Sequence, residues 1–238
     1  MKPALFWSAL LVLMLGLSYQ PAGEEQHPPG PGRVLVVVPL GDPSPKLVEN
    51  VAGSLKKRFN FQVLVNDGVP LPRSAWYLPR KRWRAEKLLD FLDTLELGEN
   101  VWRVAGITEE PISTTKGKRY DWGIAGLATI GGRNSVFSSW LFKRWKAKHH
   151  QRYLRAMDNL VLHEVGHNLG LDHCPLKRCI MADAKGSARK AAMQSSNEFC
   201  PRCTEKLRVH LKDKKIRGKW SEKELAILRK TGWLPESD

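Results

Sequence analysis

Residues 163–174 read H-E-V-G-H-N-L-G-L-D-H-C and place three histidines, a glutamate and a cysteine within one short segment. His163 and His167 are four residues apart, so on a helix both imidazoles project from one face and reach a single ion. The preceding residues predict that helix, because apolar side chains recur there at three- and four-residue steps. Gly170 stands where the helix should end, since glycine readily takes the left-handed conformation that reverses the chain. The turn that follows can bring His173 to the other two histidines.

The three histidines predict a catalytic zinc site. Three neutral imidazoles around Zn²⁺ leave the fourth tetrahedral position open to water, as catalytic sites do. Glu164 directly follows the first histidine and would face that water as general base. A bare H-E-x-x-H also arises by chance in ordinary helices, but the added glycine and third histidine make the pattern far more restrictive. The longer pattern resembles the zinc-binding motif of the metzincin peptidases.

All four cysteines of the chain follow the third histidine, as a C-x4-C pair and then a C-x2-C pair: Cys174, Cys179, Cys200 and Cys203. Two such pairs are typical of a structural zinc site in which thiolates fill every coordination position. Disulfides are the alternative interpretation, and four cysteines allow three connectivities that sequence does not distinguish. Bridges within each close pair would close very short loops and would stabilise the fold little.

The whole arrangement closely resembles the archaemetzincin family. The resemblance is carried by the histidine motif, by C-I-M at 179–181 and by C-P-R-C at 200–203, and it is strongest over residues 158–203. Upstream, residues 104–108 and 126–138 resemble strands of the family near the cleft. The resemblance implies a metzincin-like fold with two zinc ions per chain. One would be a catalytic zinc, and the other a structural zinc bound by the four cysteines.

The resemblance also implies a role for the methionine of the C-I-M motif. Met181 matches the methionine of the family's Met-turn and would form the apolar floor beneath the catalytic zinc. Many metzincins place a tyrosine just beyond this methionine, where it helps to stabilise the oxyanion. This chain has Ala182, Asp183 and Ala184 there, so the tyrosine is missing.

The N-terminus differs in composition from the rest of the chain. Residues 1–18 combine a positive start, a short apolar run and small residues near the end, which predicts a secretory signal peptide. The alternative is an uncleaved membrane anchor, although the run is short for a full span. Residues 19–32 read as a linker rich in proline and glycine. We therefore expect a secreted or periplasmic protein, a compartment in which cysteines more often form disulfides than bind zinc.

From residue 33 to residue 238 we expect one metzincin-type catalytic domain of α/β (α+β) class. Its predicted form is a twisted mixed sheet that carries helices, including the long zinc-binding helix. Residues 33–40 are apolar without alternation, which predicts a central strand buried on both faces. Further predicted strands cover 61–65, 101–107, 122–130 and 135–139. Further predicted helices follow Ser44-Pro45, cover 83–97 and begin at the capping box over 221–224.

The chain has a formal net charge of +15, and basic residues cluster at 80–84, 143–148 and 212–219. Two clusters contain a tryptophan, which would suit nucleic acid, but the secretory start argues against that partner. An exported basic protein would instead meet anionic envelope material.

Two hypotheses about the function follow from the sequence. The first is a monomeric zinc metallopeptidase that binds peptide substrates along 122–130. The alternative is an exported, zinc-stabilised basic protein that binds anionic envelope material without peptidase activity. The intact Glu164 favours the peptidase.

Overall fold

The computed structural model describes residues 33–59 and 61–211, together with the single positions 223, 226 and 230. The predicted signal peptide and linker lie outside the described residues, and so does nearly all of the predicted C-terminal helix. These three predictions therefore remain predictions. Among the described helices, none is long and apolar enough to cross a membrane.

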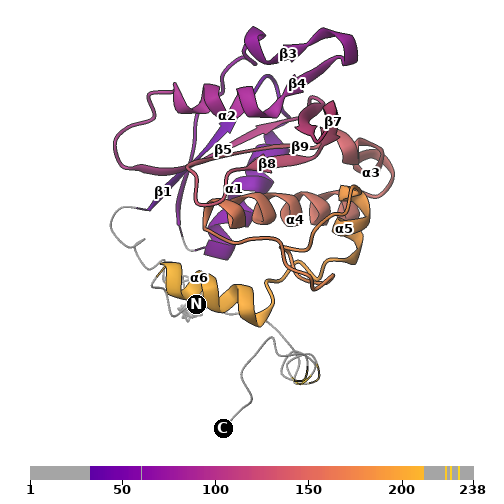
Figure 1. Ribbon diagram of the computed structural model, residues 1–238. Coiled ribbons are helices and arrows are strands. Elements are labelled where there is room, and N and C mark those ends of the chain that lie inside the picture. Colours follow the sequence, from indigo (N-terminus) through magenta and orange to yellow (C-terminus); the bar gives the residue numbers. More distant parts are fainter. Residues whose placement is uncertain (1–32, 60, 212–222, 224–225, 227–229, 231–238) are drawn as a thin grey trace, which may run out of the picture.

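A five-stranded mixed sheet forms the centre of the fold, in the order β2-β1-β5-β9-β8 (Figure 1). Its strands are β1 (Val34–Pro39), β2 (Gln62–Val65), β5 (Val101–Thr108), β8 (Gly126–Ala128) and β9 (Asn134–Ser138). The strands β2, β1, β5 and β9 pair in parallel with one another in this order. Strand β8 pairs antiparallel with β9 and forms one edge of the sheet. The predicted mixed sheet is confirmed.

Helices cover both faces of this sheet (Figure 1). Leu35 and Val37 of β1 pack into one apolar cluster with α1 (Pro45–Phe59) and α4 (His150–Asn168). The alternate residues Val36 and Val38 pack into a second cluster with α2 (Ala85–Asp93). A strand buried on both faces has no polar side to alternate with, which explains its continuous apolar run.

A second, four-stranded sheet was not predicted. Its order is β3-β4-β6-β7, and its strands are β3 (Trp76–Tyr77), β4 (Arg82–Arg84), β6 (Ile112–Lys116) and β7 (Arg119–Ile124). The single strand predicted over 122–130 is wrong, because the chain leaves this sheet at Ala125 and joins the main sheet as β8. The helix predicted over 83–97 begins later, at Ala85, since Trp83 and Arg84 pair with β6.

The remaining elements are η1 (Arg73–Ala75), η2 (Leu78–Arg80), η3 (Trp140–Phe142), α3 (Lys143–Lys148), α5 (Ala188–Gln194) and α6 (Pro201–Leu211). Of these, α3 and α5 pack against α4, whereas η1 packs against α2. Asp158 of α4 accepts hydrogen bonds from Asn50 (3.0 Å) and Ser54 of α1, which ties the two helices together. Most of α4 after Tyr153 is buried, so the helix is fixed along its length against the sheet.

Candidate active site

The buried helix α4 presents His163 and His167 one turn apart. The Nδ1 atom of His163 lies 2.8 Å from the carbonyl oxygen of Ile180, and that of His167 lies 2.7 Å from the carbonyl oxygen of Leu171. A carbonyl oxygen only accepts, so each Nδ1 carries the proton and donates it. The lone pair of each ring is therefore on Nε2, which is the tautomer that metal-binding histidines need.

Helix α4 ends in a Schellman motif at Gly170, where the sequence predicted the end of the helix. Gly170 has φ +84°, and its N–H donates to the carbonyl of His167 at 2.9 Å. The N–H of Leu171 reaches back to the carbonyl of Gly166 at 3.0 Å, and the buried Leu171 side chain anchors the turn. The reversed chain brings His173 back, with its ring centroid 5.3 Å from His163 and 4.8 Å from His167.

The three histidines fit a metal ion. Each offers a ring nitrogen, and these nitrogens lie within 4.8 Å of one another. The two Nε2 atoms on α4 are 3.1 Å apart, close to the spacing of about 3.3 Å that zinc–nitrogen bonds give in a tetrahedron. Burial, with the nearby His167, lowers the pKa of His163 to about 3, so the ring is neutral at neutral pH. Two neutral lone pairs that face each other favour a cation between them.

Glu164 lies between α4 and the edge strand β8. Its side chain is almost completely buried, and this burial raises the pKa of Glu164 to about 8. Gly126 of β8 makes room for it, because a Cβ atom at that position would lie 2.4 Å from Oε1 of the glutamate. The glycine is therefore required for space, and the carboxyl group is held directly against the strand.

A cleft of about 370 Å³ opens beside these groups. It runs along Trp122–Leu127 and contains His163, Glu164 and His173, so the structure places it at the predicted strand region. Three alanines of α5, at positions 188, 191 and 192, also line it and leave it open. A larger hollow of about 1090 Å³ lies between α1 and the loops after β1 and β2, and it contains none of the histidines.

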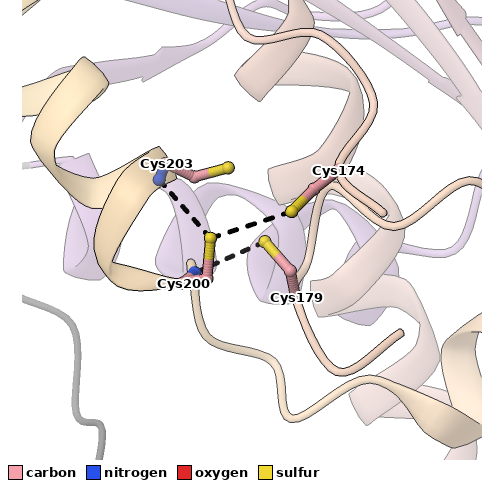
Figure 2. Close-up of side chains that lie close together, drawn as sticks. All are labelled: Cys174, Cys179, Cys200 and Cys203. Atoms are coloured by element: carbon pink, nitrogen blue, oxygen red, sulfur yellow. Dashed lines mark hydrogen bonds between the residues drawn. The ribbon is translucent and has the colours of Figure 1, made fainter. Parts of the chain in front are cut away.

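The four cysteines meet in a second buried cluster (Figure 2). Cys174 and Cys179 come from the segment after α4, whereas Cys200 directly precedes α6 and Cys203 lies in its first turn. None of the four forms a disulfide in the structure. The sulfur atoms of Cys174 and Cys200 are 3.8 Å apart, which is about the spacing of two thiolates on one tetrahedral zinc ion. Hydrogen bonding by Cys174 and the other two cysteines lowers the pKa of Cys200, which favours a thiolate in the cluster.

Met181 lies between the two clusters. Its side chain is fully buried, and a Cβ atom at Gly166 of α4 would lie only 2.5 Å from its sulfur. The methionine therefore packs directly against the helix that carries the histidines. Its backbone carbonyl accepts a hydrogen bond from the N–H of Cys174 at 2.6 Å, which connects the methionine to the first residue of the cysteine cluster.

Two histidines on a buried helix, a third brought back by the turn after it, an adjoining glutamate and a buried methionine that follows them define a metzincin-type fold, the architecture of zinc metallopeptidases. The sequence model of peptidase family M54 matches residues 59–209, and the chain belongs to this family, the archaemetzincins. An archaemetzincin from Natronomonas pharaonis is 28% identical over 174 residues, which cover 70% of this chain and 95% of that protein. Another from Methanopyrus kandleri is 34% identical over 142 residues, covering 60% and 75% respectively.

Solved structures agree with this assignment. The crystal structure of the Methanopyrus kandleri archaemetzincin matches with a TM-score of 0.65 and 30% identity, and covers 78% of this chain and 98% of that one. That of the Archaeoglobus fulgidus archaemetzincin matches with a TM-score of 0.60 at 24% identity, covering 73% and 99%, and supports the fold. Family membership supports a zinc metallopeptidase.

The structure brings together every site residue named from the sequence, in two groups: His163, Glu164, His167 and His173, and then Cys174, Cys179, Cys200 and Cys203. Sequence reasoning missed Gly126 and the carbonyls of Leu171 and Ile180. A carbonyl group carries no side-chain signal. Gly126 does stand in the segment that resembles the family, but only packing shows why it must be glycine.

Replacing Gly166 with alanine tests the contact with Met181. We expect the free energy of unfolding to fall by about 1–3 kcal/mol, because the new methyl group overpacks a buried site. This loss would occur although alanine is the better helix former. Gly53→Ala in α1 is the matched control, since no atom lies within 4 Å of its added Cβ, and it should not destabilise. Chemical denaturation of both variants decides the point, and equal stabilities would contradict it.

Proposed function

We propose that this protein hydrolyses peptide bonds, with Zn²⁺ held by His163, His167 and His173. The observation that carries the proposal is the convergence of three imidazole nitrogens beside a buried glutamate in an open cleft. Membership in a peptidase family supports it over the alternative of a basic protein that only binds anionic envelope material. A pure binding protein would gain nothing from a carboxyl group buried at that position.

His163, His167 and His173 would hold the zinc ion, which would supply Lewis acidity toward the attacking water and the scissile carbonyl. Glu164 acts as general base: its carboxylate takes a proton from the attacking water and passes it to the leaving amine. A carboxyl group whose pKa lies near the operating pH is suited to both transfers, because it takes up and releases a proton at little cost. The hydrogen bonds from His163 and His167 to backbone carbonyls keep the imidazoles oriented throughout.

The edge strand β8 is suited to hold the substrate. It lies at the end of the main sheet and borders the cleft, so an extended peptide can add to it as a further strand. The carboxyl group of Glu164 packs against Gly126 of this same strand. A peptide aligned on β8 therefore presents its backbone to the general base.

The position after the Met-turn supplies no oxyanion donor. Asp183 lines the cleft there. A hydrogen bond from the backbone N–H of Lys185 lowers the pKa of Asp183, so its carboxylate is ionised and only accepts hydrogen bonds. We infer that stabilisation of the developing negative charge depends on zinc more heavily than in peptidases with a tyrosine at this place.

We also propose that Cys174, Cys179, Cys200 and Cys203 hold a second, structural zinc ion. The four sulfur atoms fit a closed thiolate site, in which no coordination position is left for water. Two zinc ions per chain would then have different properties, one exchangeable and one tied to folding.

Replacing Glu164 with alanine should abolish peptide cleavage and leave zinc bound, because the residue is a base and not a ligand. General bases of this kind contribute on the order of 10²–10⁴ in rate. Activity on a peptide mixture and the zinc content of the purified protein are the measurements, with Glu99→Ala as a control at an exposed position. Cleavage that persisted in Glu164→Ala would sink the mechanism.

Gly126→Ala tests whether the position of the carboxyl group matters. The added methyl group must displace Glu164, so we expect kcat/KM to fall by about tenfold or more with zinc content nearly unchanged. Overpacking should also lower the free energy of unfolding by about 1–3 kcal/mol, so activity is compared at a temperature where both variants are folded. Gly53→Ala, which adds the same group in open space, should keep full activity. An active Gly126→Ala variant would show that the observed placement of Glu164 is dispensable.

Chelation should distinguish the two proposed zinc ions. The open three-histidine site should lose its metal to a chelator first, and the thiolate site later. Cys174→Ser should destabilise the fold strongly, since structural zinc contributes on the order of 10 kcal/mol or more at neutral pH. Elemental analysis paired with thiol titration of the denatured chain makes the measurement. One zinc ion with no free thiols would mean that the cysteines form disulfides.

A further inference from the structure

A second hollow of about 540 Å³ adjoins the cleft on the other side of the loop after Met181. The two hollows share His173 and Asp183 in their walls. Three exposed lysines also line the second one, namely Lys177, Lys185 and Lys190. A substrate that extends beyond the catalytic histidines therefore meets a cationic surface.

The opposite rim of the cleft is cationic as well. Lys116 and Arg119 face each other across the β6–β7 hairpin, and both cations lie 5.2 Å from the centroid of the Trp122 ring. Trp122 lines the cleft and reaches the facing loop, where a Cβ atom at Gly186 would lie 3.7 Å from its ring. The hairpin and the loop thus meet, and their cations form one patch. We call the five residues Lys116, Arg119, Lys177, Lys185 and Lys190 the cationic rim.

The cationic rim has fewer acidic partners than other cations of the fold, because its Lys116 and Lys185 share the single carboxylate of Asp183. Arg58 pairs with Glu198, Arg82 with Asp121, and Lys146 with Glu109. No ion pair within the described part of the chain includes a residue of the rim. Asp183 is the one carboxylate among the described residues that line the second hollow, against three lysines. Like charges that outnumber the opposite charges near them cost free energy, which a ligand of opposite charge would recover.

We propose that the cationic rim selects peptides with acidic side chains on either side of the scissile bond. This inference rests on the proposed peptidase function, and it names the substrate class of the same cleft. Low-dielectric walls focus the field of the rim into the cleft and raise the local concentration of acidic segments. Nucleic acid is the less favoured ligand, because stacking needs a free aromatic face and the ring of Trp122 already carries two cations.

Binding tests this proposal without requiring cleavage. The probe is a pair of labelled peptides that share an apolar central dipeptide and differ only in flanks of glutamate or glutamine. Zinc-loaded, full-length Glu164→Ala protein should bind the glutamate peptide at least about tenfold more tightly at low ionic strength. The preference should largely vanish in about 0.5 M salt, where exposed charges are screened. Equal affinities for the two peptides at low salt would overturn the proposal.

Charge reversals locate the effect. Lys116→Glu and Lys185→Glu should each weaken binding of the glutamate peptide about threefold or more and leave the glutamine peptide nearly unaffected. Lys57→Glu in α1, which changes the net charge equally outside both hollows, should have a smaller effect. An equal effect of Lys57→Glu would assign the preference to net charge and overturn the role of the rim.

Two further measurements distinguish recognition of acidic peptides from nucleic-acid binding and from the proposed peptidase function. A single-stranded oligonucleotide of matched charge should compete more weakly than the glutamate peptide, and stronger competition would overturn the proposal in favour of a nucleic-acid surface. Absence of cleavage by the wild-type protein would count against the proposed peptidase function alone. The binding preference of the Glu164→Ala protein would still decide whether the rim recognises acidic peptides.

Discussion

The segment from Leu171 to Ala182 serves both clusters at once, and the positions of all three histidines depend on it. The carbonyl of Leu171 orients His167, and that of Ile180 orients His163. His173 lies within the segment and is followed directly by Cys174, whose N–H bonds the carbonyl of Met181. The thiol cluster therefore fixes the backbone on which the histidine cluster is built. A closed zinc site there would preorganise the open one, which is what a catalytic metal site requires of its surroundings.

Two glycines allow side chains near the histidine cluster to pack closely against α4 and β8. Gly166 lets the side chain of Met181 pack against α4, and Gly126 lets the side chain of Glu164 pack against β8. In both cases the missing Cβ atom is what admits the neighbour, and neither glycine has positive φ. Burying a carboxyl group is costly. Burial raises the pKa of Glu164, which suits the general base that we propose.

Much of the site could be predicted from the sequence, because its signals are local. The spacing of the histidines and the glycine after them specify a helix, its end and the return of His173. The apolar run of β1 likewise indicated burial on both faces. The second sheet and the division of the predicted strand at Ala125 could not be predicted, since they depend on pairing between distant segments. The same reason hid Gly126, whose role appears only when Glu164 lies beside it.

The cationic rim, like the second sheet, could not be predicted from the sequence. The sequence shows basic clusters at 80–84, 143–148 and 212–219, yet none of them supplies the cationic rim. Its five residues come from a hairpin and from the chain after α4 and gather only in the folded protein. They are exposed, whereas the histidines of α4 and Glu164 are held in packed surroundings. Exposed charges can change with little effect on a fold. Under our proposal, selection among substrates can therefore be tuned at the rim while the buried histidines and Glu164 stay unchanged.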